Sequence, residues 1–205
     1  MRIFSVDLER SGQSVSQHFT TQIGVVCFES TLFDENDPKK CIISTFSEYL
    51  PQPEGTCWEE RCVKEFWEKN PELYEKHKNG VANARDDVMQ RFIEWVDANK
   101  DPNLEQNLLI TDNSAFDYVC LAPLIAPYRS LLYLFGDYQQ TPLDVVSYYL
   151  GLQRRNVPAT NTWAARSSHK LAPKFKEILN LQAHDAGADA TVIGLNYLWV
   201  TGDLA

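Results

Sequence analysis

Two carboxylates lie near the end of the first apolar run of the chain, in the stretch "SVDLERSG" at residues 5–12. If this run is a β-strand, its side chains alternate between two faces, so Asp7 and Glu9 point to the same side. Their backbones are then about 7 Å apart, at a rise of about 3.3 Å per residue. Such a pair can bind a metal ion, or the two carboxylates can simply be solvent-exposed residues at the end of a strand.

A third carboxylate occupies a helix face that is otherwise apolar. Residues 114–126 have the pattern of a helix on which Asp117, Cys120 and Leu124 share one face. A buried carboxylate is costly unless a partner satisfies it. Asp117 therefore either has such a partner or interacts with the positive end of the helix dipole.

The stretch "HDAGAD", residues 184–189, opens the last apolar segment of the chain. Asp185 is a good helix N-cap, which places His184 just outside the helix and Asp189 in its first turns. Asp189 then faces inward with Val192 and Asn196, where it can converge with His184. A histidine at this position can also be a plain surface or capping residue.

The elements that must position these residues follow from hydrophobic periodicity and turn signals. Alternating apolar residues predict strands over 2–8, 20–30 and 41–50, joined as an antiparallel meander, and a buried strand over 107–111. Helices are predicted over 59–70, with a break before Pro71, and over 82–100, 113–126 and 185–200. We further expect a strand over 130–137, and a helix over 141–152 with Thr141 as N-cap and Pro142 in its first position. A basic loop over 154–176 leads into a helix near 168–179, and the order of elements indicates an α/β fold with a mixed sheet.

Composition predicts one globular domain over residues 1–205, with 44% hydrophobic and 12% aromatic residues. The net charge of −9 argues against binding nucleic acid by bulk electrostatics, although bound cations would change that balance. No apolar stretch approaches the roughly 20 residues that a membrane helix needs, so we expect no membrane partner. The five cysteines lack metal-ligand spacing and are expected to be reduced, in an intracellular, cytoplasmic protein.

The three acidic motifs occur in a characteristic order: DxE at the end of the first strand, NxxFD opening a central helix, and HxxxxD opening the last helix. This set resembles the DEDD superfamily of exonucleases, in the subgroup with a histidine five residues before the last aspartate (DEDDh). The resemblance extends from Asp7 to Asp189. It implies a ribonuclease H-like fold, with a mixed central sheet flanked by helices. It also implies a metal-dependent 3′-to-5′ exonuclease that releases 5′-mononucleotides from the single-stranded 3′ end of DNA or RNA.

The resemblance also assigns roles to the five residues. Two divalent ions, Mg²⁺ or Mn²⁺, prefer oxygen ligands, which fits a site built from carboxylates. Asp7 is implied to bridge the two ions, Glu9 and Asp189 to hold the ion that activates water, and Asp117 to hold the ion at the leaving group. His184 is implied to be the general base, because an imidazole is largely neutral at cellular pH.

Substrate contacts are expected from Leu8, Arg10, Asn113 and Phe116, although Phe116 can instead wedge its helix against the sheet. The chain departs from the family pattern at Arg10, where relatives often have threonine, and at Asp112, where they have histidine or glycine. The stretch 154–176 contains six Lys or Arg and no acid, so it is either a phosphate-binding rim or an ordinary solvated loop. Trp163 within it either stacks on a base or packs inward. Asp144 is a further candidate to support the metal ligands.

Electrostatics give a reason for cations that does not depend on resemblance. Two like charges 4 Å apart repel by about 4 kcal/mol at an effective dielectric constant of about 20. Four carboxylates in one cleft therefore need cations to neutralise them. A non-catalytic nucleic-acid-binding or protein-binding module on the same fold is the main rival hypothesis, and a metal phosphatase is a more distant one. Clustered negative charge facing a phosphate chain has no use in a module that only binds.

Overall fold

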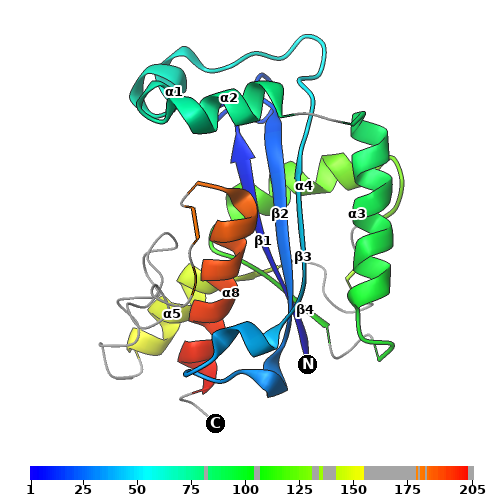
Figure 1. Ribbon diagram of the computed structural model, residues 1–205, viewed down its shortest axis with the longest axis vertical. Helices are drawn as coiled ribbons and strands as arrows, with labels where there is room; N and C mark the ends of the chain where they lie inside the picture. The colour runs from blue at the N-terminus through cyan, green and yellow to red at the C-terminus, as the bar shows by residue number, and fades with distance from the viewer. Residues whose placement is uncertain are drawn as a thin grey trace.

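A five-stranded mixed sheet forms the centre of the protein, in a computed structural model that describes residues 1–80, 83–103, 107–130, 134–135, 142–154, 179, 181–182 and 184–202 (Figure 1). The strands are β1 (Arg2–Arg10), β2 (Thr20–Glu29), β3 (Ile42–Tyr49), β4 (Asn107–Thr111) and β5 (Leu143–Asp144). Their spatial order is β3-β2-β1-β4-β5. β1, β2 and β3 pair antiparallel, whereas β4 pairs parallel to β1, and β5 parallel to β4. The predicted meander and mixed α/β sheet are confirmed.

The helices connect and cover these strands. The longer ones are α1 (Glu60–Glu65), α2 (Pro71–Asn79), α3 (Arg85–Asn99), α4 (Ser114–Ile125), α5 (Val145–Arg154) and α8 (Ala186–Gly202). Short 3₁₀ turns are η1 (Ser30–Leu32), η2 (Pro38–Cys41) and η3 (Trp67–Lys69). The predicted break before Pro71 is present, because α2 begins at that proline, which suits the first helical position. Nowhere in these described ranges is there a helix both long and apolar enough to cross a membrane.

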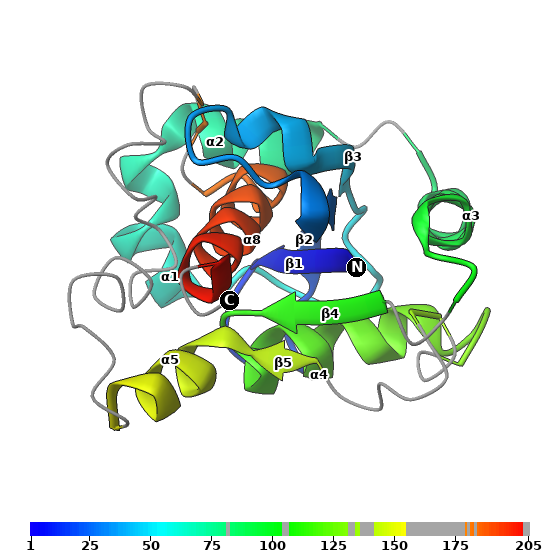
Figure 2. The ribbon, with the colours of Figure 1, turned by 90° about the horizontal axis from the view of Figure 1, so that it is seen from below.

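The alternation of β1 decides which helix covers which face of the sheet. Phe4, Val6 and Leu8 pack in one cluster with residues of α3 and α4. Ile3 packs in the other cluster with residues of α5 and α8. Figures 1 and 2 show α8 and α3 on opposite sides of the sheet, and the α1–α2 segment across the end toward which β1 points. Asp7 and Glu9 therefore lie on the face that α8 covers, at that same end.

The start of one predicted helix is wrong. Leu143 and Asp144 do not form the first turn after Pro142; they pair in parallel with Ile110 and Thr111, and the helix begins at Val145. Pairing with the open edge of β4 outweighs the local signal of a proline before an amphipathic run, because tertiary context overrides weak propensity. Thr141 lies outside the described residues.

Two other predictions are only partly covered by the structure. Of the strand expected over 130–137, residues 130, 134 and 135 are described, and none of these three is in a strand. Of the basic stretch 154–176, only Arg154 is described, as the last residue of α5. The helix expected near 168–179 and Trp163 lie outside the described residues.

Candidate active site

Three of the predicted residues form a tight cluster. One ligand atom each of Glu9, His184 and Asp189 lies within 4.8 Å of the other two. Glu9 comes from the end of β1, Asp189 from the first turn of α8, and His184 from the residue before the N-cap of α8. The structure thus brings together side chains that are 180 residues apart in the sequence.

Asp7 and Asp117 are buried beside this cluster. Their exposed fractions are 9% and 3%. Burial raises the pKa of the Asp7 carboxyl well above its usual range, and the negative charges of Glu9, Asp117 and Asp189 raise it further. Burial followed by the charge of Asp189 likewise raises the pKa of Glu9. All four predicted carboxylates therefore share one electrostatic environment.

Opposing effects act on the pKa of Asp117. Burial raises the pKa of its carboxyl to about 7, and the charge of Asp112 adds to this rise. Hydrogen bonds from the Thr111 hydroxyl and from the backbone of Asn113 and Leu8 oppose it by stabilising the ionised form. Asp112 thus adds negative charge to the site.

His184 adopts a backbone conformation that few residues favour. Its φ is +62°, in the left-handed region. The next residue, Asp185, caps the helix: its Oδ1 accepts a hydrogen bond from the Ala188 N–H (3.1 Å). The His184 N–H donates to Oδ2 of Asp189 (2.9 Å). The ring of Phe66 packs edge-on against the imidazole, with the ring centroids 4.7 Å apart. This left-handed turn is what lets His184 face Glu9 and Asp189 although it lies outside the helix.

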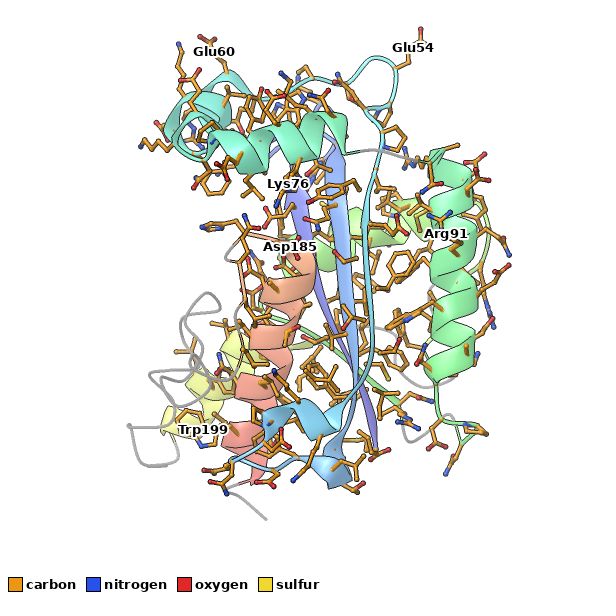
Figure 3. All side chains as sticks on the ribbon, viewed as in Figure 1. Glu54, Glu60, Lys76, Arg91, Asp185 and Trp199 are labelled. Atoms are coloured by element: carbon orange, nitrogen blue, oxygen red, sulfur yellow. The ribbon has the colours of Figure 1, made fainter. Side chains whose placement is uncertain are left out.

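Gln22 joins the start of α8 to the sheet. It pairs directly with Glu9 across the β1–β2 ladder and is 1% exposed. Its side-chain Nε2 donates to Oδ2 of Asp185 (2.8 Å) and to Oγ of Ser47, and its Oε1 accepts from the Ala186 N–H (3.2 Å). Figure 3 shows Asp185 at the upper end of α8, below Lys76 of α2. Gln22 thereby fixes the position of α8 relative to Glu9.

Gly24 allows α8 to approach β2 closely. It pairs with Asp7, and a Cβ atom at this position would lie 2.0 Å from the backbone carbon of Ala186 and 2.3 Å from the backbone nitrogen of Gly187. Both neighbours are main-chain atoms, which cannot rotate away as a side chain can. A glycine inside a strand pattern is a signal of such an approach, and it is the one sequence signal available for this contact. No local pattern indicates the roles of Gln22 or Phe66.

We expect Gly24→Ala to destabilise the fold and to weaken the site together. The added methyl must push the start of α8 away from β2, at a cost of roughly 1–3 kcal/mol or more in the free energy of unfolding. The same displacement moves His184 and Asp189 away from Glu9. Urea denaturation measures the first effect, and the metal-dependent rise in melting temperature measures the second.

Gly151→Ala is the matched control for that substitution. Gly151 lies in α5, and a Cβ atom there would meet nothing within 4 Å. Alanine is the better helix former, so this variant should be neutral or slightly more stable. Equal stability of the two variants would show that α8 does not need the close approach at Gly24.

Asp144 supports the element that carries Asp117. Its Oδ2 accepts hydrogen bonds from the Ser114 N–H (3.0 Å) and from the Ser114 hydroxyl (3.1 Å). Ser114 is the first residue of α4, and Asp117 lies in the first turn of that helix. Asp144 therefore holds the N-terminus of α4 in place from the neighbouring strand β5.

The predicted substrate contacts differ in exposure. Leu8 is 4% exposed and packs in the apolar core, whereas Asn113 is exposed before α4. The Arg10 guanidinium lies on the same face as Leu8. Its Cζ is 5.5 Å from the ring centroid of Phe116 on α4. Direct substrate contact by these four residues stays a prediction.

The donor set suits hard divalent cations. Carboxylate oxygens predominate, and the raised pKa values of Asp7 and Glu9 reflect burial together with neighbouring negative charges. A bound Mg²⁺ or Mn²⁺ would supply the positive charge that the described surroundings of these carboxylates lack. The residues present therefore fit divalent metal ions.

We expect rising pH to lower the stability of the metal-free protein and to increase the stabilisation that metal gives. An aspartate ordinarily has a pKa near 3.9, so between about pH 4 and 7 folded Asp117 retains a proton that the unfolded chain releases. In EDTA, stability is then greatest at low pH and falls as pH rises through this window, by up to about 1.4 kcal/mol per pH unit for one proton. Mn²⁺ binds the ionised form, so its stabilising effect grows with pH. At a hundred times its dissociation constant it should add about 2.7 kcal/mol, or roughly 5–10 °C in melting temperature.

Melting curves of wild type and Asp117→Asn across this pH range, in EDTA and in Mn²⁺, measure both effects. The variant should lose stability less steeply with rising pH in EDTA, and should gain less from Mn²⁺. An unchanged wild-type melting temperature in millimolar Mn²⁺ at pH 8 would contradict the metal site.

Comparisons with known proteins agree with this arrangement at the level of fold. No family model and no curated protein matches the sequence. Among solved structures, the chain is similar to the nuclease domain of 3′hExo, a DEDDh family member bound to rAMP, with a TM-score of 0.61 and 16% identity over 98% of this chain and 92% of that one. It is also similar to cell-death related nuclease 4 (CRN-4), with a TM-score of 0.63 and 14% identity over 98% of this chain. The chain spans 64% of the CRN-4 structure, less than two thirds of it.

A further similar structure is a 3′-exonuclease that recognises the 3′ end of a histone mRNA stem-loop, with a TM-score of 0.55 and 15% identity over 98% of this chain and 82% of that one. At these identities the likeness shows the fold. The chain has the ribonuclease H-like fold of DEDDh-type 3′ exonuclease domains, as its sequence motifs predict.

Proposed function

We propose that this protein is a metal-dependent 3′-to-5′ exonuclease that hydrolyses single-stranded ends of DNA or RNA and releases 5′-mononucleotides. The observation that carries the proposal is the meeting of Glu9, His184 and Asp189 within 4.8 Å, next to buried Asp7 and Asp117. These are the five residues that the DxE, NxxFD and HxxxxD motifs single out. The fold shared with 3′ exonuclease domains supports the direction of hydrolysis.

Each acidic residue has a proposed part in holding two divalent cations. Asp7 would help to hold both, Glu9 and Asp189 would hold one, and Asp117 would hold the other. When bound, the cations supply activation of a water molecule and neutralisation of charge on the phosphate and the leaving oxygen. Because carboxylates are deprotonated when they bind metal, the raised pKa values of Asp7 and Asp117 make binding weaker at acidic pH.

His184 is the proposed general base. A ring nitrogen of His184 takes the proton of the attacking water, whose oxygen forms the new bond to phosphorus. The bond from phosphorus to the 3′ oxygen of the preceding nucleotide breaks, which leaves a shortened strand with a 3′ hydroxyl and a free 5′-mononucleotide. The edge of Phe66 and the hydrogen bond from the His184 N–H to Asp189 hold the imidazole in position for this transfer.

The test compares single-stranded DNA and RNA labelled at either end. In Mg²⁺ or Mn²⁺, 5′-labelled strands should shorten stepwise into a ladder, whereas 3′-labelled strands should release a labelled mononucleotide from the start. EDTA should abolish both results. Shortening from the 5′ end, or cleavage in EDTA, would contradict the proposal, and binding of strands without cleavage in metal would favour the non-catalytic module.

A further inference from the structure

A cavity lies on the face of the sheet opposite Asp7 and Glu9. Its volume is about 200 Å³, and it lies between the loops that flank β2, the start of α3 and the middle of α4. Arg10 of β1 reaches it on the same side as Leu8, which packs with Cys120 and Leu124 of α4. Asp7 and Glu9 point to the other side of β1, whereas Asp117 lies on α4, three residues before Cys120 of the cavity lining.

Two cations and no carboxylate line this cavity in the described part of the chain. Arg10 and Arg85 are the cations, and the imidazole of His18 lies beside them. The protein as a whole carries a net charge of −9. A cavity with only basic charged groups is therefore a local feature and not a consequence of a basic surface.

Arg10 is buried, and none of the described residues forms an ion pair with it. Its exposed fraction is 7%. Its terminal nitrogens donate to the main-chain oxygens of His18 (2.7 Å) and Ser14 (3.3 Å) and to Sγ of Cys120 (2.9 Å). Its Nε–H is buried and has no acceptor in the described part of the chain. Burying a guanidinium against neutral acceptors alone is unfavourable, so an anion in the cavity would compensate a charge that the fold leaves uncompensated.

Arg85 adds a second cation at the other wall. It is the first residue of α3, so the positive end of the helix dipole lies at the same cavity. Within the described ranges, neither Arg85 nor Arg10 has a carboxylate within ion-pair distance. The carboxylate next to Arg85 in sequence, Asp86, accepts a hydrogen bond from the Tyr128 hydroxyl.

We propose that this cavity binds a compact anion that carries a phosphate dianion. Two arginines match a dianion better than a monovalent carboxylate, and guanidinium groups bind phosphate through paired hydrogen bonds. The volume is below the range of about 300–1,000 Å³ typical of pockets for drug-sized ligands, which favours a small ligand. Inorganic phosphate and the terminal phosphate of a nucleotide are the two sources of this group.

This inference goes beyond the proposed hydrolysis and is tested without it. In EDTA the acidic site has no cation to hold phosphate, so phosphate bound under these conditions is expected in the cavity, which the substitutions below test. Calorimetric titration of the full chain in EDTA, with inorganic phosphate and separately with a nucleoside 5′-monophosphate, measures the affinity. The unphosphorylated nucleoside is the control ligand.

Three substitutions locate the binding. Arg85→Gln removes one cation and should weaken binding of both phosphates about tenfold, equivalent to about 1.4 kcal/mol. Val15→Glu places a carboxylate at a cavity residue that is 49% exposed and so tolerates change; it should abolish binding. Arg91→Gln, on the same helix but paired with Glu48 outside the cavity, should leave the affinity unchanged (Figure 3).

Equal affinity for inorganic phosphate and the nucleotide supports a site for the free anion, and tighter binding of the nucleotide supports a site for its terminal phosphate. Failure of both ligands to bind wild type would overturn the proposal. So would binding that Arg85→Gln and Val15→Glu leave unchanged. A folded Val15→Glu protein, checked by its melting curve, ensures that lost binding is not lost structure.

Discussion

Replacing Asp7 with asparagine should lower the rate of nucleic-acid hydrolysis by about 10³-fold or more. Asp7 is 9% exposed, and its pKa responds to Glu9, Asp117 and Asp189, so it lies at the electrostatic centre of the site. Asparagine has the same shape but cannot supply the negative charge that holds cations. Loss of a single well-placed electrostatic group in an enzyme commonly costs 10²–10³ in rate, and this group is proposed to serve both cations.

The same substitution should not destabilise the metal-free protein. It removes a buried carboxyl that is repelled by its neighbours, so the melting temperature in EDTA at pH 8 should stay the same or rise. Single-turnover cleavage of a labelled strand in saturating metal measures the rate. Asp37→Asn, at the N-cap of η2 and with a side chain that is 47% exposed, is the control and should keep the wild-type rate. Activity of Asp7→Asn within about tenfold of wild type would contradict its proposed role.

Replacing His184 with asparagine should lower the turnover rate by about 10²–10⁴-fold, the usual contribution of a general base. Asparagine is chosen because it tolerates the left-handed conformation at φ +62°, so the backbone before α8 can stay as it is. Asp189 and Glu9 remain in place, and the metal-dependent rise in melting temperature should therefore persist. Retained metal stabilisation with lost turnover separates a base from a structural residue.

Two further readouts sharpen the test of His184. His184→Asn has no ionisable group at this position, so its pH–rate profile should differ in shape from that of wild type if His184 is the base. His184→Gly also tolerates the positive φ, and added imidazole should restore part of its rate. Turnover of His184→Asn close to that of wild type would assign the proton transfer to another group.

The sequence predicts the site better than it predicts the contacts that hold it. Asp7 and Glu9 follow from strand alternation, Asp117 from a charge on an apolar helix face, and Asp189 from the N-cap at Asp185. Each of these signals is local: it depends on residues within one or two helical turns, or on alternate residues of one strand. Each can therefore be recognised from a few neighbouring residues. The structure confirms all of these local placements.

The contacts that align those elements are not local. Gln22 and Asp185 are 163 residues apart in the chain, and no sequence pattern around either residue predicts their contact. The error at Leu143 has the same origin, because the edge of β4 that captures it lies more than thirty residues earlier. Arg10 makes a third non-local contact: its guanidinium bonds to Cys120 of α4 and to the loop that precedes β2, and its expected contact with substrate stays a prediction.

The most direct test of the metal site is the position of bound Mn²⁺, located by anomalous X-ray diffraction from crystals of wild type grown with Mn²⁺ and a non-hydrolysable single-stranded substrate. We predict anomalous peaks in contact with the carboxylates of Asp7, Glu9, Asp117 and Asp189, and their loss in Asp7→Asn crystals. Mn²⁺ bound elsewhere, with these four carboxylates free of metal under conditions in which the protein cleaves nucleic acid, would contradict it.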